Sequence, residues 1–103
     1  MDKAMLQYCK ELKAQRPFLG LVTQDSEGHP YKLLILGRGE NASYQEDDRA
    51  IIFEIHFGSG LISTTSMRRW DSGTRLSTAG KTRIADRVAN CFRAKGIGDV
   101  TTI

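Results

Sequence analysis

Alternating apolar and polar residues between positions 50 and 57 give the clearest structural signal in the sequence. A β-strand sends successive side chains to opposite faces, so this spacing predicts a strand whose odd-numbered residues face the core. Gly58 and Gly60 supply the positive φ angles of a short loop, so residues 61–70 are expected to return as the second strand of a hairpin. The apolar, inward-facing positions are Ile51, Phe53, Ile55 and Phe57.

The register expected for this hairpin determines which polar side chains meet on its outer face. A three-residue loop places Phe57 opposite Leu61, and it places Glu54 beside Thr64 on the other face. His56 shares that outer face with Glu54, two residues away. The pattern therefore predicts one possible polar site on the sheet face, formed by Glu54, His56 and Thr64.

Two segments have the three- and four-residue apolar spacing of amphipathic helices. Residues 2–15 begin at Asp2, a good N-cap, and end before Pro17, which disfavours the helical conformation in the preceding residue. A second helix is expected to begin at Ser77 or Thr78 and to stop at Gly96. The apolar stripes are Met5, Tyr8, Cys9 and Leu12 in the first helix, and Ile84, Ala85, Val88, Ala89, Cys91 and Phe92 in the second.

The remaining segments complete an α+β domain. Residues 18–24 and 31–38 are expected to be strands joined by a turn, whereas residues 39–49 are expected to form an acidic loop. The chain order is thus α-β-β-β-β-α, which predicts a four-stranded, mainly antiparallel sheet with two helices packed on one face. The other face would carry Ile52, Ile62 and half of the run 33–36, and such an apolar face favours a homodimer.

Length and composition set broad limits on the protein. A chain of 103 residues is long enough for one domain, 1–103, with its own core, and it contains neither a secretory signal pattern nor an apolar run long enough for a membrane span. We expect a cytoplasmic protein in which Cys9 and Cys91 stay reduced, and neither a cofactor nor a metal is predicted. The triplet 46–48 is acidic, but it lacks the alternating ligands and the glycine of a calcium loop.

Charge is distributed unevenly along the chain. The net charge is +3, but residues 59–103 contain eight Lys or Arg against three Asp or Glu. A basic half can attract an anionic partner. The candidate binding residues in this half are Arg68, Arg69, Trp70, Arg75, Lys81, Arg83 and Arg87.

The segment from Arg68 to Arg75 has three interpretations. Arginine and tryptophan dominate protein–protein hot spots, and they also suit nucleic acid, in which arginine contacts phosphate and an aromatic ring stacks on a base. Alternatively, Trp70 completes the core. Arg83 and Arg87 are expected to lie on the solvated stripe of the second helix and to extend the basic patch.

Motifs of known chemistry are weak in this sequence. Residues 75–82 approximate the phosphate-binding pattern G-x-x-x-x-G-K-[ST], but Arg75 stands in place of the first glycine, whose turn brings the backbone N–H groups onto the phosphates. Glu54, His56 and a hydroxyl are the parts of a nucleophilic triad, but a flat sheet face provides neither a cleft nor an oxyanion hole.

The sequence therefore predicts a small, non-catalytic binding protein, a homodimer that acts through the arginine and tryptophan loop and the basic helix face. The first alternative is a nucleic-acid-binding protein that uses the basic C-terminal half. The second alternative is a small-molecule-binding domain with a pocket between the sheet and the helices.

Overall fold

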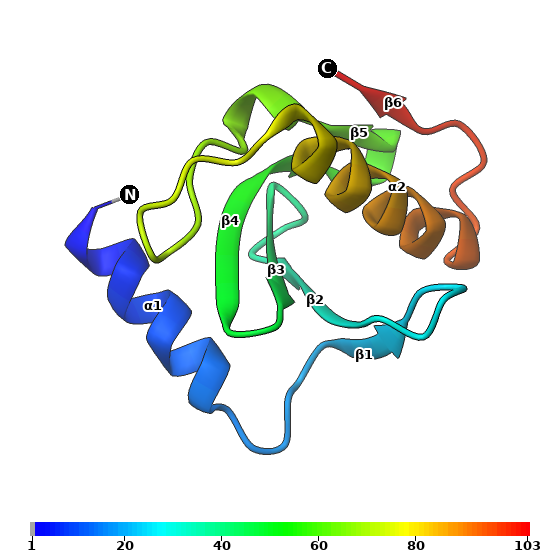
Figure 1. The fold of residues 1–103 in the computed structure, drawn as a ribbon. Coiled ribbons are helices and arrows are strands. Elements are labelled where there is room, and N and C mark those ends of the chain that lie inside the picture. Colours follow the sequence, from blue (N-terminus) through cyan, green and yellow to red (C-terminus); the bar gives the residue numbers. More distant parts are fainter. Residues whose placement is uncertain (1) are drawn as a thin grey trace.

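The computed structural model, which describes residues 2–103, is built on a curled sheet of six strands (Figure 1). Neighbouring strands follow the order of the chain, and every pair is antiparallel except β5 and β6, which are parallel. The α+β class is confirmed, but the expected number of four strands is wrong. In chain order the elements are α1 (Lys3–Ala14), β1 (Leu21–Gln24), β2 (Pro30–Leu36), β3 (Asn41–Glu46), β4 (Arg49–His56), β5 (Leu61–Ile62), α2 (Thr78–Ala94) and β6 (Thr101–Thr102).

Strand β3 lies in the segment that was expected to be an acidic loop. Its small and polar residues have low strand propensity, and this concealed the strand in the sequence. In the structure Ala42 and Tyr44 are fully buried, and a two-residue turn with Asp47 at φ +50° joins β3 to β4. Packing of the tyrosine in the core therefore outweighs the weak local preference.

The hairpin from β4 to β5 has a different register from the expected one. Ile51, Phe53 and Ile55 are buried, so the inward face of β4 is confirmed. However, Ile55 pairs with Ile62, because the connecting loop has four residues, 57–60, and not three. The shift by one position turns Ile62 into the core, where it is fully buried, so it does not lie on the outer face.

Helix α2 covers the core face of the sheet and follows the sequence pattern closely. The side chain of Ser77 accepts a hydrogen bond from Gly80 N at 3.0 Å and caps the helix. At the other end Gly96 has φ +90°, and Ile97 N donates to Phe92 O at 3.1 Å, which is the glycine-stopped terminus that was predicted. All six apolar positions predicted for this helix are buried.

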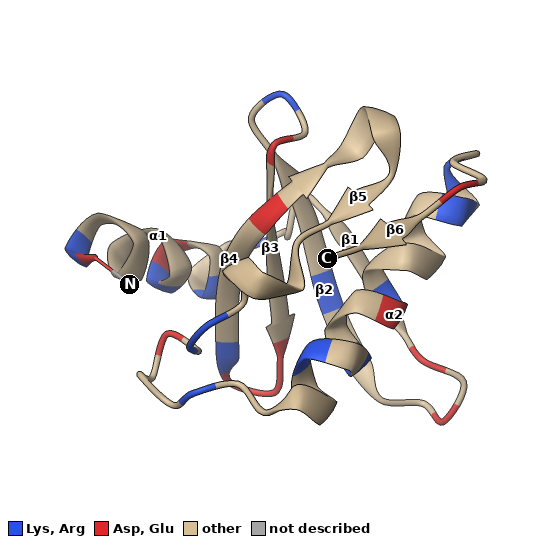
Figure 2. Ribbon diagram, turned by 90° about the horizontal axis from the view of Figure 1, so that it is seen from above, with Lys and Arg blue, Asp and Glu red and all other residues tan. Residues whose placement is uncertain are grey.

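Helix α1 lies on the opposite face of the sheet, so the expectation of two helices on one face is wrong (Figures 1 and 2). Asp2 caps it, accepting a hydrogen bond from Met5 N at 2.8 Å, and Cys9 and Leu12 are buried outside the main core cluster. The outer face that favoured a homodimer is therefore partly covered by the chain itself.

The two cysteines, both in the described part of the chain, form no disulfide. They lie on α1 and α2, which the sheet separates. Burial raises the pKa of both the Cys9 and the Cys91 thiols, so neither site favours a reactive thiolate. Within residues 2–103 the structure also contains no helix with the length and apolar character needed to cross a lipid bilayer.

Replacing Phe53 with alanine tests the core assignment. Because its ring is buried between α2 and the sheet, Phe53→Ala should lower the free energy of unfolding by about 3–5 kcal/mol. The exposed Ile103→Ala should change it by less than about 0.5 kcal/mol. Urea unfolding followed by circular dichroism measures both, and equal effects of the two variants would contradict the assignment.

Candidate anion-binding site

A short hairpin formed by residues 68–76 lies against the edge of β4 and carries most of the predicted binding residues. Trp70 N donates to Thr74 O at 2.9 Å, and Leu76 N donates to Arg68 O at 2.9 Å. Gly73, at φ +90°, makes the tight turn. The backbone of the segment is thus held by its own hydrogen bonds.

Asp71 fixes this hairpin to the rest of the molecule. Its backbone N donates to Ala50 O at 2.9 Å, and its Oδ1 accepts from Ala50 N at 3.0 Å. Its Oδ2 pairs with Lys13 Nζ of α1 at 2.5 Å. One side chain therefore holds β4, the hairpin and the N-terminal helix together.

Arg69 and Arg75 lie directly opposite each other across the hairpin. The flanking hydrogen bonds show that they form a non-hydrogen-bonded pair, the arrangement in which opposing side chains come closest. Like charges in this position are destabilising. The hairpin therefore keeps an unfavourable charge arrangement that a bound anion would relieve.

Four cationic side chains surround one hollow of about 550 Å³, which we call the basic recess. None of the four forms an ion pair with a carboxylate of residues 2–103; Arg69 donates instead to the backbone oxygen of Gly73 at 3.1 Å. The first turn of α2 next to the recess contains no acidic residue. The residues that line the recess are Arg68, Arg69, Arg75, Leu76 and Lys81.

Trp70 belongs to the core and not to the basic recess. Its side chain is 3% exposed, its ring centroid is 6.3 Å from that of Tyr44, and the guanidinium of Arg49 lies 4.3 Å from the ring. Of the three interpretations of the segment, the burial of the indole agrees with the one in which Trp70 completes the core. An exposed tryptophan beside the arginines is therefore not found.

Arg83 and Arg87 also lie apart from the basic recess, because acidic side chains neutralise them. The expectation that Arg87 is solvated is wrong: it is 7% exposed and donates to Asp25 Oδ2 at 2.6 Å and to the hydroxyl of Tyr44. Arg83 donates to both oxygens of Glu46, each at 3.0 Å. The basic stripe of α2 thus forms internal ion pairs.

Glu46 is the centre of this network. It is buried at the end of β3, and besides Arg83 it accepts hydrogen bonds from Tyr44 at 3.0 Å and from Arg49 at 2.8 Å. We had expected Glu46 to lie in an exposed loop. The alternation Ala42, Tyr44, Glu46 was the available signal, since a strand places all three on the core face.

The network shifts the pKa values of its members. Burial raises the pKa of Glu46, but hydrogen bonds and charges from Tyr44, Arg83 and Arg49 outweigh it, so the net pKa is lowered. The backbone N–H of His29, with help from Arg87, lowers the pKa of Asp25 to about 2. Burial raises the pKa of Tyr44 to about 12. Both carboxylates are therefore ionised at neutral pH.

The predicted polar site on the sheet face is not assembled. Strand β5 ends at Ile62, so Thr64 is not the cross-strand neighbour of Glu54, and its hydroxyl donates to Ile103 O. His56 Nδ1 lies 2.8 Å from Ser59 Oγ. Among residues 2–103 no hydrogen bond connects the side chains of Glu54, His56 and Thr64.

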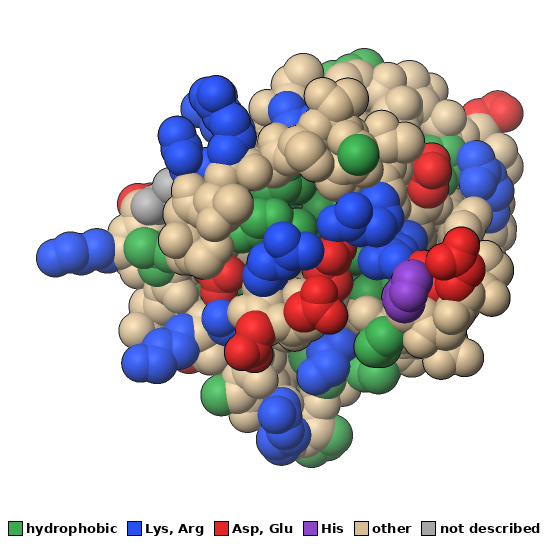
Figure 3. All heavy atoms as spheres, in the orientation of Figure 1, with side chains coloured by type: hydrophobic (Ala, Val, Ile, Leu, Met, Phe, Trp, Pro, Cys, Tyr) green, Lys and Arg blue, Asp and Glu red, His purple; other side chains and the backbone are tan. Residues whose placement is uncertain are grey.

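Other hollows bear on the small-molecule alternative and on metal binding. One of about 1010 Å³ lies between the turn 25–30 and α2, but Asp25 and Arg87, which both line it, pair with each other. On the face drawn in Figure 3, acidic and basic side chains are likewise interleaved across the centre. No group of three His, Cys, Asp or Glu within residues 2–103 is placed to hold a metal ion.

Neutralising Glu46 tests the network. Glu46→Gln leaves the buried Arg87 with fewer counter-charges, and it should lower the free energy of unfolding by about 3 kcal/mol. The exposed Glu40→Gln is the matched control and should have little effect. Chemical denaturation at pH 7 measures both, and a stable Glu46→Gln protein would contradict the role of the network.

The same variant should alter the dependence of stability on pH. The folded-state pKa values of Glu46 and Asp25 lie below their usual 4.5 and 3.8, so their contribution is complete above about pH 5 and is lost as the pH falls towards 2. Glu46→Gln should therefore have a flatter stability profile between these pH values. An unchanged slope would show that Glu46 does not take part in the linkage.

The chain was also compared with known proteins. The sequence matches no protein-family model, and no curated protein or solved structure is significantly similar to the chain. What the basic recess binds must therefore be inferred from the side chains that line it.

Proposed function

We propose that this chain is a small, non-catalytic binding protein whose basic recess holds an anionic group of a partner. The observation that carries the proposal is the set of four cationic side chains that have no carboxylate partner in the described part of the chain, two of them directly opposite each other. Elsewhere in the structure the buried arginine Arg87 is paired with carboxylates. The four cations of the recess thus form a cluster within the basic half that remains available to an anion.

We favour an acidic protein surface over nucleic acid as the partner. Proteins that bind single strands combine basic grooves with exposed aromatic rings on which bases stack. Here Trp70, Tyr44 and Tyr31 are buried, and none of the described residues that line the recess is aromatic. Nucleic acid remains the alternative, since phosphates would also satisfy the four cations.

The proposed homodimer has a different basis from the one expected from the sequence. Strand β1 is an edge of the sheet; Val22 on this strand is 60% exposed, and Leu19, which precedes the strand, is 75% exposed. Two copies of an edge strand can pair antiparallel about a two-fold axis, which gives a self-complementary contact. We propose that a second copy covers this edge.

Charge reversal tests the basic recess with heparin as the probe anion. The double variant Arg69→Glu and Arg75→Glu should reduce affinity for heparin about tenfold or more, because charge-assisted contacts are lost and replaced by repulsion. Lys3→Glu with Lys10→Glu on α1 is the control with the same change in net charge. Isothermal titration measures both, and equal losses in the two variants would contradict a localised site.

A salt series separates the two classes of partner. If nucleic acid is bound, the affinity for a labelled oligothymidylate should fall linearly on a logarithmic plot as salt is raised, and Arg75→Gln should reduce the slope by about one. An acidic protein fragment that binds tightly where the oligonucleotide does not would favour the first proposal. Fluorescence anisotropy measures both.

The dimer is tested by its mass in solution. Wild-type protein should have twice the chain mass of 11.5 kDa in sedimentation equilibrium, and Val22→Lys should shift it to the monomer because an edge lysine opposes strand pairing. Lys10→Glu is the surface control and should leave the mass unchanged. A wild-type monomer at about 100 µM, well above the Kd of an ordinary specific dimer, would reject this contact.

A further inference from the structure

The cations of the basic recess have no internal partner that would compete with a ligand. The side chains of Arg68, Arg75 and Lys81 form neither a hydrogen bond nor an ion pair with any of residues 2–103. Arg69 donates to the backbone oxygen of Gly73. The described residues that line the recess include neither a carboxylate nor a histidine. The amount of negative charge that these cations require therefore has to come from outside this part of the chain.

Two placements of these cations are electrostatically unfavourable in the empty site. Arg69 and Arg75 form the closest kind of cross-strand pair, in which like charges are destabilising. Lys81 lies in the first turn of α2, where the helix macrodipole is positive and favours an anion over a cation. A bound anion relieves both, and it does so more completely the more charge it carries.

A phosphate monoester matches this cluster better than a carboxylate does. A carboxylate carries one negative charge on two oxygens, whereas a phosphate monoester carries about −1.5 to −2 at neutral pH on three acceptor oxygens. Three of the four cations are arginines, whose planar guanidinium donates two parallel hydrogen bonds to phosphate. Two carboxylates would supply a similar charge, but they repel each other and both side chains have to be ordered. The cluster therefore favours one compact dianion.

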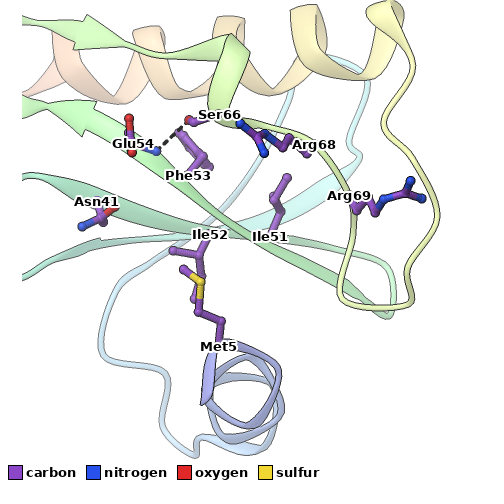
Figure 4. Close-up of a pocket in the computed structure, with 9 residues that line it drawn as sticks. All are labelled: Met5, Asn41, Ile51, Ile52, Phe53, Glu54, Ser66, Arg68 and Arg69. Carbon is purple, nitrogen blue, oxygen red and sulfur yellow. Dashed lines mark hydrogen bonds between the residues drawn. The ribbon is translucent and has the colours of Figure 1, made fainter. Parts of the chain in front are cut away.

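A second hollow, of about 400 Å³, shares two arginines with the recess and also disfavours a run of acidic residues. Arg68 and Arg69 line it together with Glu54. In Figure 4 Glu54 lies on the side of this hollow away from Arg69, and among the ion pairs of residues 2–103 it pairs with neither arginine. Its carboxylate would repel a further acidic side chain placed in this second hollow.

We propose that the anion held by the basic recess is the phosphate monoester of a phosphorylated serine or threonine in the partner protein. The phosphate oxygens accept hydrogen bonds from the arginines, and Lys81 adds a further positive charge. Leu76 is the one apolar residue among those described around the recess, and it is only 5% exposed, so the ring of a phosphotyrosine would have little apolar surface to pack against. The inference rests on the proposed function, because it names the group that the same site binds.

Synthetic peptides of matched charge test this inference. The probe is acetyl-Gly-Ala-phosphoserine-Ala-Gly-amide, compared with the same peptide with unmodified serine and with acetyl-Gly-Glu-Glu-Ala-Gly-amide. The phosphopeptide should bind at least about tenfold more tightly than the two-glutamate peptide. Isothermal titration measures the affinities, and ¹⁵N NMR should show shifts at residues 68–76 and at Lys81. Equal binding of the two charged peptides, or shifts that leave out these residues, would overturn the inference.

The pH dependence of binding identifies the dianion. The second pKa of a phosphate monoester is about 6, so the affinity for the phosphopeptide should fall about threefold between about pH 7.5 and about pH 5.5. Glutamate side chains ordinarily stay ionised over this range, so the two-glutamate peptide in the same buffers is the control for any titration of the protein itself. Parallel changes for both peptides would contradict recognition of a dianion.

A pair of variants with the same change in charge locates the contact. Arg75→Gln should weaken phosphopeptide binding about tenfold, and it should leave the free protein at least as stable as the wild type because one of two opposed like charges is removed. Lys10→Gln, on the exposed surface of α1, should leave the affinity unchanged. Equal affinities of the two variants would overturn the inference. Should Arg75→Gln fail to fold, the two charged peptides on the wild type decide the question.

The heparin experiment keeps the two proposals apart. If the Arg69→Glu and Arg75→Glu protein loses heparin affinity while the wild type binds the phosphopeptide no better than the two-glutamate peptide, the basic recess stands and the phosphate inference is rejected. If heparin affinity is unchanged in that variant, the proposed function itself fails. Inorganic phosphate that binds as tightly as the phosphopeptide would reject a polypeptide as the carrier, and an oligothymidylate that does so would reject a phosphorylated protein.

Discussion

The buried carboxylate of Glu46 is the interaction on which the arrangement of the core face depends. It connects the end of β3 to Arg49 of β4 and to Arg83 of α2, and Tyr44 donates to it from within the core. Removing one partner of a buried charged group typically costs about 3–5 kcal/mol, a large part of the 5–15 kcal/mol that stabilises a domain. The helix and the sheet are thus joined by charge as well as by apolar contact.

This network also determines which basic residues can take part in binding. The two arginines of α2 are neutralised internally by Glu46 and Asp25. The four cations of the basic recess lie beyond the reach of those carboxylates, on the hairpin and at the start of α2. Of the predicted binding residues, those left without an internal carboxylate partner among residues 2–103 are therefore confined to one small site and do not follow α2 as a stripe.

The sequence predicted those parts of the fold in which local pattern and packing agree. The helix caps at Asp2 and Ser77, the glycine stop at Gly96 and the inward face of β4 all follow from residue type and spacing. Strand β3 did not, because its residues favour a strand only once Tyr44 is packed in the core. The sequence did not predict the side of the sheet on which α1 lies either. That side depends on the packing of α1 against β4, which is a tertiary contact and has no local pattern.

For the site, the sequence identified the cations but not their partners. Arg68, Arg69, Arg75 and Lys81 do gather around one hollow. The burial of Trp70 and Arg87 depends on contacts with residues more than 20 positions away, which spacing along the chain does not encode.

The clamp made by Asp71 has a mechanical consequence. Through Lys13 the first helix is tied to the same carboxylate that holds the arginine hairpin against Ala50. Lifting that helix would release one of the supports of the hairpin. The N-terminal helix is remote in sequence from every arginine of the recess. Through Lys13 and Asp71 it nevertheless helps to hold the hairpin that carries these arginines in place.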